Sequence, residues 1–273
     1  MYDKNMNAKE IERLILTTYR KEIFRPFTKA VCDYHLVNDG DHICVCISGG
    51  KDSLVMAKCM QELERHGKAK IKCEYVVMDP GFSNDNINII KDNAEKMGIP
   101  IQIINSTIFN SVEKANHKMP CYICAKMRRG FLYDHAQKMG CNKIALGHHF
   151  DDVIETTMLS LLYNGIFNTM VPIIDSENFS GMKLIRPMYL VREENIKHFI
   201  NRIGIVPSSC SCPLKKENSK RAKVKEIIAE LKKDNFFVEY NLFKASENVE
   251  LDHIRGYIKD KKHINIYDSF DNN

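Results

Sequence analysis

The sequence contains no apolar run that approaches the ~20 residues a membrane-spanning helix needs. Its first residues, MYDKNMNAKEIERL, are charged and lack the apolar stretch of a secretory signal. Internal repeats, low-complexity tracts and linkers rich in proline and glycine are also absent. We therefore expect a cytoplasmic protein with no membrane partner, built around one large domain.

Charge of one sign does not dominate, because 40 Lys and Arg stand against 35 Asp and Glu, a formal net charge of +5. This mild excess permits a polyanionic partner without demanding one. The cations are unevenly distributed, however. The run KKENSKRAKVK, residues 215–225, has Glu217 as its single acid, and KMRR, residues 126–129, adds a second cluster. The simplest interpretation of one such cluster is a solvated helix face.

The hydrophobic pattern alternates between short apolar runs and helical periodicity. Strands are predicted at 42–47, 70–79, 100–105 and 142–147, an edge strand at 183–188, and helices at 52–67, 84–98, 125–140, 151–165 and 192–204. Such alternation predicts an α/β fold, a parallel sheet with helices on both faces. We expect three parts: an N-terminal amphipathic helical extension (1–35), the α/β domain (36–206) and a C-terminal helical, basic extension (207–273) packed on it.

Three polar loops directly follow predicted strands: SGGKDS (48–53), MDPG (78–81) and GHHFDD (147–152). In parallel sheets, ligands bind beyond the carboxyl ends of the strands. These loops, far apart in the sequence, are therefore predicted to share one site.

The first loop has features of a phosphate site but is neither a Walker A motif nor G-x-G-x-x-G. Gly49 and Gly50 let the backbone approach a ligand, and the helix that follows offers free N–H groups. Ser48 and Ser53 add hydroxyl donors, and Lys51 adds a cation. Asp52 would repel a phosphate unless Mg²⁺ bridged the two. The alternative is a tight turn in which Asp52 or Ser53 caps the helix.

The second loop, GHHFDDVIET, pairs Gly147 and His148 with Asp151 and Asp152 at a helix start. Acids there are favoured by the helix dipole, so capping beside a solvated histidine pair is the simpler interpretation. A metal site formed by His148 and Asp152 is a less favoured alternative.

Ten cysteines are many for a chain of 273 residues. Those in apolar runs, such as Cys44 and Cys46, are expected to be packing residues. Cys121 and Cys124 form the single C-x-x-C and, like Cys210 and Cys212, lie in a Pro-flanked context that we interpret as a loop. Structural zinc, a redox pair and an iron–sulfur cluster held by three thiolates are the interpretations to weigh, and spacing leaves zinc and the cluster equally open.

These motifs together resemble a known family. SGGKDS resembles the S-G-G-x-D-S loop of the PP-loop ATP pyrophosphatases, and GHHFDDVIET is similar to a segment of their tRNA-thiolating members. With the C-x-x-C, a late cysteine before a basic helix, and KLIRPM, the chain resembles the tRNA 2-thiocytidine synthetase family from about Arg13 to about Val249. The resemblance implies an adenine nucleotide alpha-hydrolase-like fold and ATP cleavage between its α and β phosphates.

The resemblance also implies roles for individual residues. ATP and Mg²⁺ would be bound by Ser48, Gly49, Gly50, Lys51, Asp52, Ser53, Met78, Asp79, Gly147 and His148. Catalytic roles would fall to Asp52, Asp151, Asp152 and Arg128, with Cys121, Cys124 and Cys212 also holding a [4Fe–4S] cluster. tRNA would contact Arg128, Arg129, Arg186, Lys215, Lys216, Lys220, Arg221 and Lys223. The third ligand departs from the family's usual C-x-x-C-G, because this chain has CSCPL there, so Cys210 is the reserve.

The implied function is an ATP-dependent tRNA sulfurtransferase that converts cytidine 32 to 2-thiocytidine. Its sulfur would come from a donor such as a cysteine desulfurase, and a homodimer is left open. The alternatives are a PP-loop enzyme that thiolates uridine or ligates an amine, as in lysidine formation, and a nucleotide-binding protein with structural zinc on its cysteines.

Overall fold

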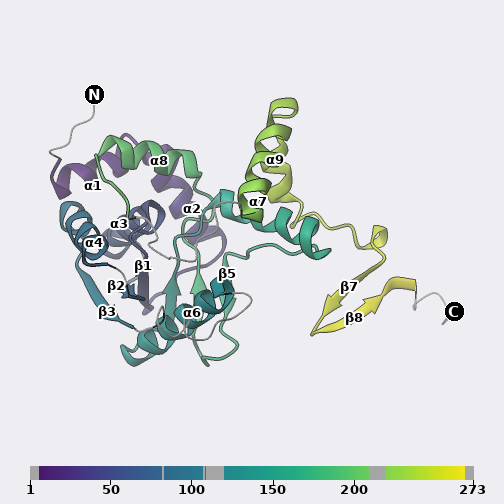
Figure 1. Ribbon diagram of the computed structural model, residues 1–273, viewed down its shortest axis with the longest axis horizontal. Helices are drawn as coiled ribbons and strands as arrows, with labels where there is room; N and C mark the ends of the chain where they lie inside the picture. The colour runs from purple at the N-terminus through teal and green to yellow at the C-terminus, as the bar shows by residue number, and fades with distance from the viewer. Residues whose placement is uncertain (1–5, 82, 107, 109–119, 209–218, 268–273) are drawn as a thin grey trace.

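The computed structural model describes residues 6–81, 83–106, 108, 120–208 and 219–267, and for 120–122 it describes the backbone alone. Its main sheet has the strand order β3-β2-β1-β4-β6-β5 (Figure 1). Pairing is parallel for β1 (His42–Ile47), β2 (Lys72–Asp79), β3 (Ile101–Asn105), β4 (Lys143–Ala145) and β6 (Lys183–Ile185). The α/β fold predicted from the sequence is confirmed.

One detail of the sheet was predicted wrongly. Strand β6 is not at the edge, because the short strand β5 (Ile173–Asp175) pairs antiparallel outside it. Only three residues form β5, and two of them are exposed, so the segment lacks the apolar run that marks a buried strand.

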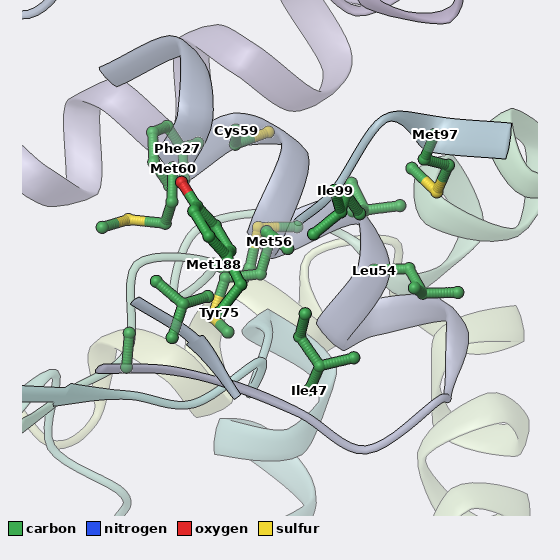
Figure 2. Packing of buried hydrophobic residues seen from close by; sticks show 14 of the residues in the cluster. Phe27, Ile47, Leu54, Met56, Cys59, Met60, Tyr75, Met97, Ile99 and Met188 are labelled. Atoms are coloured by element: carbon green, nitrogen blue, oxygen red, sulfur yellow. The ribbon is translucent and has the colours of Figure 1, made fainter. Parts of the chain in front are cut away.

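Alternate residues of β1 face two different hydrophobic layers. Ile43, Val45 and Ile47 pack in the larger cluster with α3 (Lys51–His66), α4 (Asn84–Met97) and α8 (Glu193–Arg202), part of which Figure 2 shows. Cys44 and Cys46 face the other side, where α6 (Pro120–Lys138) covers the sheet. This two-sided burial explains why β1 is continuously apolar.

Glycines end two of the predicted helices. Helix α3 stops at Gly67, and α4 stops at Gly98, whose φ of +65° is the left-handed conformation that closes many helices. A side chain at either position would strain the backbone or meet a neighbour, so these ends could be located from the sequence.

The N-terminal region was predicted as one amphipathic helix, but it forms three helical segments. They are α1 (Ala8–Leu16), the π-helical η1 (Arg20–Phe24) and α2 (Arg25–Asp33). Pro26 has no N–H to continue the hydrogen-bond ladder, and it lies in the first turn of α2. The amphipathic pattern predicted here, an apolar stripe of Ile11, Leu14, Ile15 and Tyr19, is confirmed, since Ile11 and Ile15 are fully buried in the main core and the other two pack against it partly buried.

The C-terminal region packs through two helices and ends in a hairpin. Helices α9 (Lys220–Asp234) and α10 (Val238–Lys244) lie against α7 (Phe150–Leu159), which continues as the π-helical η2 (Ser160–Asn164). Phe243 stacks on Phe150 with their ring centroids 4.6 Å apart. After the short helix η3 (Leu251–His253), strands β7 (Gly256–Lys259) and β8 (Lys262–Asn265) form a hairpin that projects away from the sheet (Figure 1). No helix in the described ranges is long and apolar enough to cross a membrane.

Candidate functional site

The sheet reverses its order at β1, which lies between β2 and β4. The loops that follow these three strands therefore meet at one edge, as predicted. A cavity of about 410 Å³ opens there, and its walls include Ser48, Asp52, Ser53, Met78, Arg128, Arg129, Gly147, His148 and Asp152. The sequence did not single out its apolar lining, Cys46, Ile47, Ala125, Leu132, Ile144 and Leu146, since in the sequence these look like ordinary core residues.

The first loop is folded around the hydroxyl of Ser53. This oxygen accepts from the backbone N–H of Ser48 at 3.1 Å and donates to the carbonyl of Gly50 at 2.9 Å. Gly49 has a φ of +81°, a conformation that other residues rarely adopt. The residue at the N-cap of α3 is Gly50, which has no side chain to cap the helix, so the alternative in which Asp52 or Ser53 caps it is wrong. The first N–H groups of α3 thus have no side-chain cap.

Gly147 brings the second loop against the first. A Cβ atom at this position would lie 3.0 Å from the backbone nitrogen of Ser53 and 3.1 Å from the carbonyl carbon of Asp52. Both are backbone atoms of α3, so they have little freedom to move aside. The close approach of the two loops at the cavity therefore requires glycine here.

Lys51 and Asp52 begin α3 with opposite charges. The Lys51 ammonium is 3.0 Å from an oxygen of Asp52 and 2.9 Å from one of Glu193. Burial opposes the charge on Lys51, but these two carboxylates raise its pKa. The other oxygen of Asp52, Oδ1, is buried and has no hydrogen-bond partner. Nε2 of His149 lies 3.6 Å from this oxygen, too far for a hydrogen bond. A buried carboxylate oxygen that accepts no hydrogen bond, beside a phosphate-type loop, is suited to a cation.

The two histidines of the second loop have different roles in the structure. His149 is buried and caps α7, where its Nδ1 accepts from the backbone N–H of Asp152 at 3.4 Å and the Asp152 carboxylate accepts from the backbone N–H of His149 at 3.1 Å. Capping is thus confirmed, but the predicted solvated histidine pair is wrong, because His149 is buried. His148 lines the cavity, and burial, followed by the nearby charge of Arg186, lowers the pKa of its imidazole to about 4. His148 is therefore neutral near pH 7.

Asp151 and Asp152 point to different places, because neighbouring residues on a helix are rotated by about 100°. Asp151 accepts from the backbone N–H of Glu193 at 2.7 Å and so holds the start of α8. Asp152 lines the cavity, with one oxygen 3.0 Å from Arg221. Within the described residues, no group of three or more His, Cys, Asp or Glu side chains is arranged for a metal ion.

A chain of ion pairs links the first loop to α9. Glu193, which holds Lys51, also lies 3.2 Å from Lys225, and Lys225 lies 3.3 Å from Glu155. Arg221 closes the chain between Glu155 at 3.6 Å and Asp152. Burial opposes ionisation of Glu193, yet hydrogen bonds from Lys51 and Lys197 hold its pKa far below the usual value. Sequence reasoning missed Glu193 and Glu155, since an acid in a helix carries no signal of what it pairs with.

Three arginines gather on the cavity side of α6 and β6. Arg128 and Arg129 line the cavity from α6. Arg186 follows β6 and donates to the backbone carbonyl of Val171. Burial first and the charge of Arg129 second lower the pKa of Arg186 to about 10. Two cations that repel each other at a cavity are expected where an anion is to be bound.

The cysteine pair lies at the start of a helix, so the prediction that it lies in a loop is wrong. Helix α6 begins at Pro120, because proline fits the first turn of a helix, where its missing N–H is not needed. Cys121 is in that first turn, and Cys124 lies half-buried one turn on, against the small cluster of Met78 and Ile108. The side chain of Cys121, and all of Cys210, Cys212, Lys215 and Lys216, lie outside the described residues.

The chain is nevertheless fixed on both sides of residues 209–218. Before them, the N–H of Ser208 donates to the carbonyl of Gly49 at 3.1 Å. After them, Arg221 contacts Asp152. The segment that carries the two late cysteines therefore leaves and rejoins the described structure beside the cavity.

The remaining predicted residues lie outside the cavity lining. Asp79 accepts from the N–H of Gly81 at 2.8 Å and shapes the loop after β2. Lys220 lies over the ring of Tyr163, 4.7 Å from its centroid, and Lys223 pairs with Glu226 on the exposed face of α9.

Comparison with known proteins identifies the family. The model of the PP-loop domain matches residues 16–206. The tRNA-cytidine(32) 2-sulfurtransferase of Pelobacter propionicus is 33% identical over 83% of this chain and 85% of its own length, and that of Geobacter sulfurreducens is 34% identical over 84% and 90%. The solved structure of the U34-tRNA thiolase NcsA from Methanococcus maripaludis with its [4Fe-4S] cluster has the same fold, with a TM-score of 0.69 at 23% identity over 88% of this chain and 81% of that chain. The resemblance stated from the sequence motifs is confirmed, and the chain belongs to the PP-loop family of tRNA-cytidine(32) 2-sulfurtransferases.

Proposed function

We propose that the protein is an ATP-dependent tRNA sulfurtransferase that replaces the C2 oxygen of cytidine 32 by sulfur and so forms 2-thiocytidine. The observation that carries this proposal is the cavity itself. It combines a phosphate-type loop, two carboxylates and two arginines at the reversal of a parallel sheet. The names of the curated relatives supply the target nucleotide.

The triphosphate would lie on the loop Ser48–Ser53. Backbone N–H groups of the first turn of α3 suit its oxygens, because no side chain caps this helix. The N–H of Gly50, which donates to the Ser48 hydroxyl at 3.4 Å, could turn to a phosphate instead. Lys51 would exchange part of its contact with Glu193 for a phosphate. The adenine would lie near Met78, and Asp79 shapes the loop beside it. Gly147 leaves room for the nucleotide, and neutral His148 lies in the same wall.

Mg²⁺ fits this site on the evidence of Asp52. Its Oδ1 is buried and accepts no hydrogen bond, next to the loop where the phosphates would lie. Mg²⁺ commonly binds one or two carboxylates together with substrate phosphates. Asp52 would hold the ion, which would offset the charge that otherwise repels the triphosphate. Of the acidic pair on α7, Asp152 is our choice for a catalytic role, because it lines the cavity while Asp151 holds α8.

The reaction has two displacements. The C2 oxygen of cytidine forms a bond to the α-phosphorus of ATP, the bond from that phosphorus to the bridging oxygen breaks, and pyrophosphate leaves with the electron pair. A sulfur nucleophile at the oxidation level of sulfide then bonds to C2. The C2–O bond breaks, and AMP leaves with the original oxygen. Arg128 would neutralise charge that develops on the adenylate, since it lines the cavity.

A [4Fe–4S] cluster fits the donor chemistry that this chain offers. Cys121 and Cys124 lie three apart at the start of α6, so they share one helix face, and the same helix carries Arg128 into the cavity. Cys212, with Cys210 in reserve, would be the third ligand, from the segment that begins and ends beside the cavity. A cluster with three thiolate ligands supplies one open iron that can carry sulfide.

The tRNA would be held by cations around the cavity, and its phosphates make such binding dependent on salt. Arg128, Arg129 and Arg186 are the nearest, and Lys215, Lys216, Lys220, Arg221 and Lys223 would extend the contact. We further propose a cytoplasmic location and a cysteine desulfurase as the sulfur donor, and we leave a homodimer open.

The decisive test is mass spectrometry of nucleosides in tRNA from a strain that lacks this protein. We expect 2-thiocytidine to disappear and to return with the wild-type gene but not with Cys121→Ala or Asp52→Asn. A matched control is Cys59→Ala, which changes a fully buried core cysteine. Unchanged 2-thiocytidine in the deletion strain, or loss of a thiouridine instead, would contradict the proposal.

A further inference from the structure

The segment 160–172, SLLYNGIFNTMVP, exposes an unusual amount of apolar surface. Its side chains Leu161, Leu162, Tyr163, Ile166, Phe167 and Val171 are each 40% to 54% exposed. We call these six residues the apolar platform. The segment contains no charged residue. Exposed apolar residues that occur singly are normal, but a contiguous group marks a surface for interaction.

Hydrogen bonds from residues outside the segment hold the platform in place. The hydroxyls of Thr157 and Thr169 are 2.9 Å apart, and Tyr189 donates to the carbonyl of Met170 at 2.8 Å. Arg186 binds the carbonyl of Val171 through its side chain and that of Pro172 through its own N–H. The exposure therefore belongs to a built structure that presents these side chains to solvent.

Cations border the platform. Lys220 lies over the ring of Tyr163, 4.7 Å from the centroid. Arg186 anchors the other end, and its pKa is lowered by burial and by Arg129, which itself lines the cavity. Exposed aromatic rings interleaved with cations are typical of surfaces that bind single-stranded nucleic acid, where bases stack on the rings and cations face the phosphates.

The platform continues from the cavity along one helix. Asp152 lines the cavity, and Tyr163 is eleven residues further along α7 and η2. At the rise of an α-helix this separation is roughly 16 Å. Tyr163 is thus too far from the cavity to touch a base that reacts there, but it is within reach of that base's neighbours in a loop.

We propose that the apolar platform, through Tyr163 and Phe167, stacks on unpaired bases that flank the target nucleotide in a loop of the substrate RNA. This inference rests on the proposed function, because it assumes an RNA substrate. RNA loops are recognised largely by such stacking of splayed bases on aromatic side chains. The platform would select a loop over a helical stem, while the cations select any polyanion.

The first test is the affinity of the full-length protein for a tRNA transcript with cytidine at position 32, measured by fluorescence anisotropy. Tyr163→Ala and Phe167→Ala should each weaken binding roughly ten-fold, since one base stacked on an aromatic side chain contributes about that much. Tyr163→Phe and Phe167→Trp should restore it. Phe236→Ala is the matched control, because Phe236 is 77% exposed but lies beyond the opposite end of α9 from Lys220.

Salt dependence separates stacking from charge. The logarithm of the binding constant falls linearly with the logarithm of the salt concentration, and the steepness of this fall reports the number of phosphate contacts. Loss of a phosphate contact makes the fall less steep, whereas loss of a stacking contact does not change it. Tyr163→Ala should therefore keep the wild-type slope, and Lys220→Ala should reduce it. A smaller slope for Tyr163→Ala would mean that its ring serves only to position Lys220, and the proposal would be overturned.

A second test changes the RNA and uses only the wild-type protein, so it does not depend on whether a variant folds. Abasic sites placed one at a time in the loop of an RNA stem–loop should weaken binding to the wild-type protein at one or two positions next to the target. No loss of affinity at any flanking position would overturn the stacking proposal.

Two further outcomes are distinguishable from these. If the alanine variants dissociate oligomers in sedimentation but bind RNA normally, the platform is a protein interface. If the wild-type protein neither binds nor thiolates tRNA, the proposed function itself fails.

Discussion

At the scale of single residues, Asp52 is the side chain whose charge most needs an explanation. It lies beside a phosphate-type loop and keeps one buried oxygen that accepts no hydrogen bond. We predict that Asp52→Asn lowers the rate of ATP–pyrophosphate exchange roughly 100-fold or more, the usual scale for a lost charge contact in the transition state. The remaining activity should respond less to added Mg²⁺ than that of the wild type.

Asp85→Asn is the control for this change, because Asp85 is also an acid in the first turn of a helix, but is exposed on α4. It should leave exchange unchanged. An Asp52→Asn protein that keeps the wild-type dependence on Mg²⁺ would argue that the ion binds elsewhere.

His148 makes the stability of the fold depend on pH. Its pKa is about 4 in the folded chain, because burial and then Arg186 disfavour the charged imidazole, against a usual value near 6.5. Between these values the unfolded chain binds a proton that the native chain does not, so stability falls as the pH falls from about 6.5 to about 4. The free energy of unfolding of the wild-type protein should therefore fall by about 3 kcal/mol more across that window than that of His148→Gln, which has no imidazole to protonate. Urea denaturation at a series of pH values measures this difference. Equal pH dependence in both proteins would contradict this cause.

Some residues of the site could be predicted from the sequence, and others could not. SGGKDS and GHHFDD named Ser48, Asp52, Gly147 and His148, which do line one cavity, because short loops between regular elements bring their residues to a fixed place. Glu193 could not be found in this way. It holds Lys51 at 2.9 Å from a helix about 140 residues later, and nothing local to either residue encodes the pairing.

At the scale of elements, the contact between the two loops depends on a missing side chain. Gly147→Ala would place a Cβ atom 3.0 Å from the backbone nitrogen of Ser53, so the loop or α3 must shift. We predict that ATP affinity, measured by titration calorimetry, falls on the order of 10-fold to 100-fold, as misplaced binding groups usually cause.

Gly130→Ala is the matched control, since a Cβ atom there would meet nothing within 4 Å and the residue lies inside α6. It should leave ATP affinity unchanged and stabilise the helix by about 0.5–1 kcal/mol. Normal ATP affinity in Gly147→Ala would mean that the nucleotide does not lie on this loop.

Elements with a strong local signal were predicted well. Strand β1 occupies 42–47 as expected, because it is apolar on both faces and two glycines follow shortly after it. The errors occur where distant packing decides. The N-terminal stripe gave the right buried residues, Ile11 and Ile15, but not the π-helical turn between α1 and α2. The short strand β5 exists only because β6 offers it an edge to pair with.

At the scale of the whole molecule, the C-terminal helices are joined to the α/β domain mainly through aromatic packing on α7. Phe243 is buried between Phe150 and Tyr189, with ring centroids 4.6 and 5.3 Å away. We predict that Phe243→Ala lowers the free energy of unfolding by about 3–5 kcal/mol, the usual cost of removing a buried phenylalanine. Tyr257→Ala, on the projecting hairpin, should change it by no more than about 0.5 kcal/mol.

The parallel sheet was predictable from the alternation of elements, because connections between parallel strands follow few rules. The hairpin of β7 and β8 was not, since its strands are short, polar and largely exposed. The position of the cavity, at the reversal of strand order, was predictable, but its size and shape were not. Its apolar walls come from residues that serve equally well as ordinary core.

The two-sided burial of the sheet has a consequence for chemical labelling. Burial raises the pKa of Cys59, and it raises those of Cys73 and Cys141 to about 12, while the pKa of Cys44 is raised by a hydrogen bond with Cys46 and by burial. Alkylating reagents attack the thiolate, so these sulfurs are unreactive at neutral pH. Among the described cysteines, Cys32 is exposed and Cys124 half-buried. Peptide mapping after iodoacetamide treatment should therefore detect alkylation of Cys32 and Cys124 with little alkylation of the buried cysteines. Protection of Cys124 by iron and sulfide, but not of Cys32, would report its ligation directly.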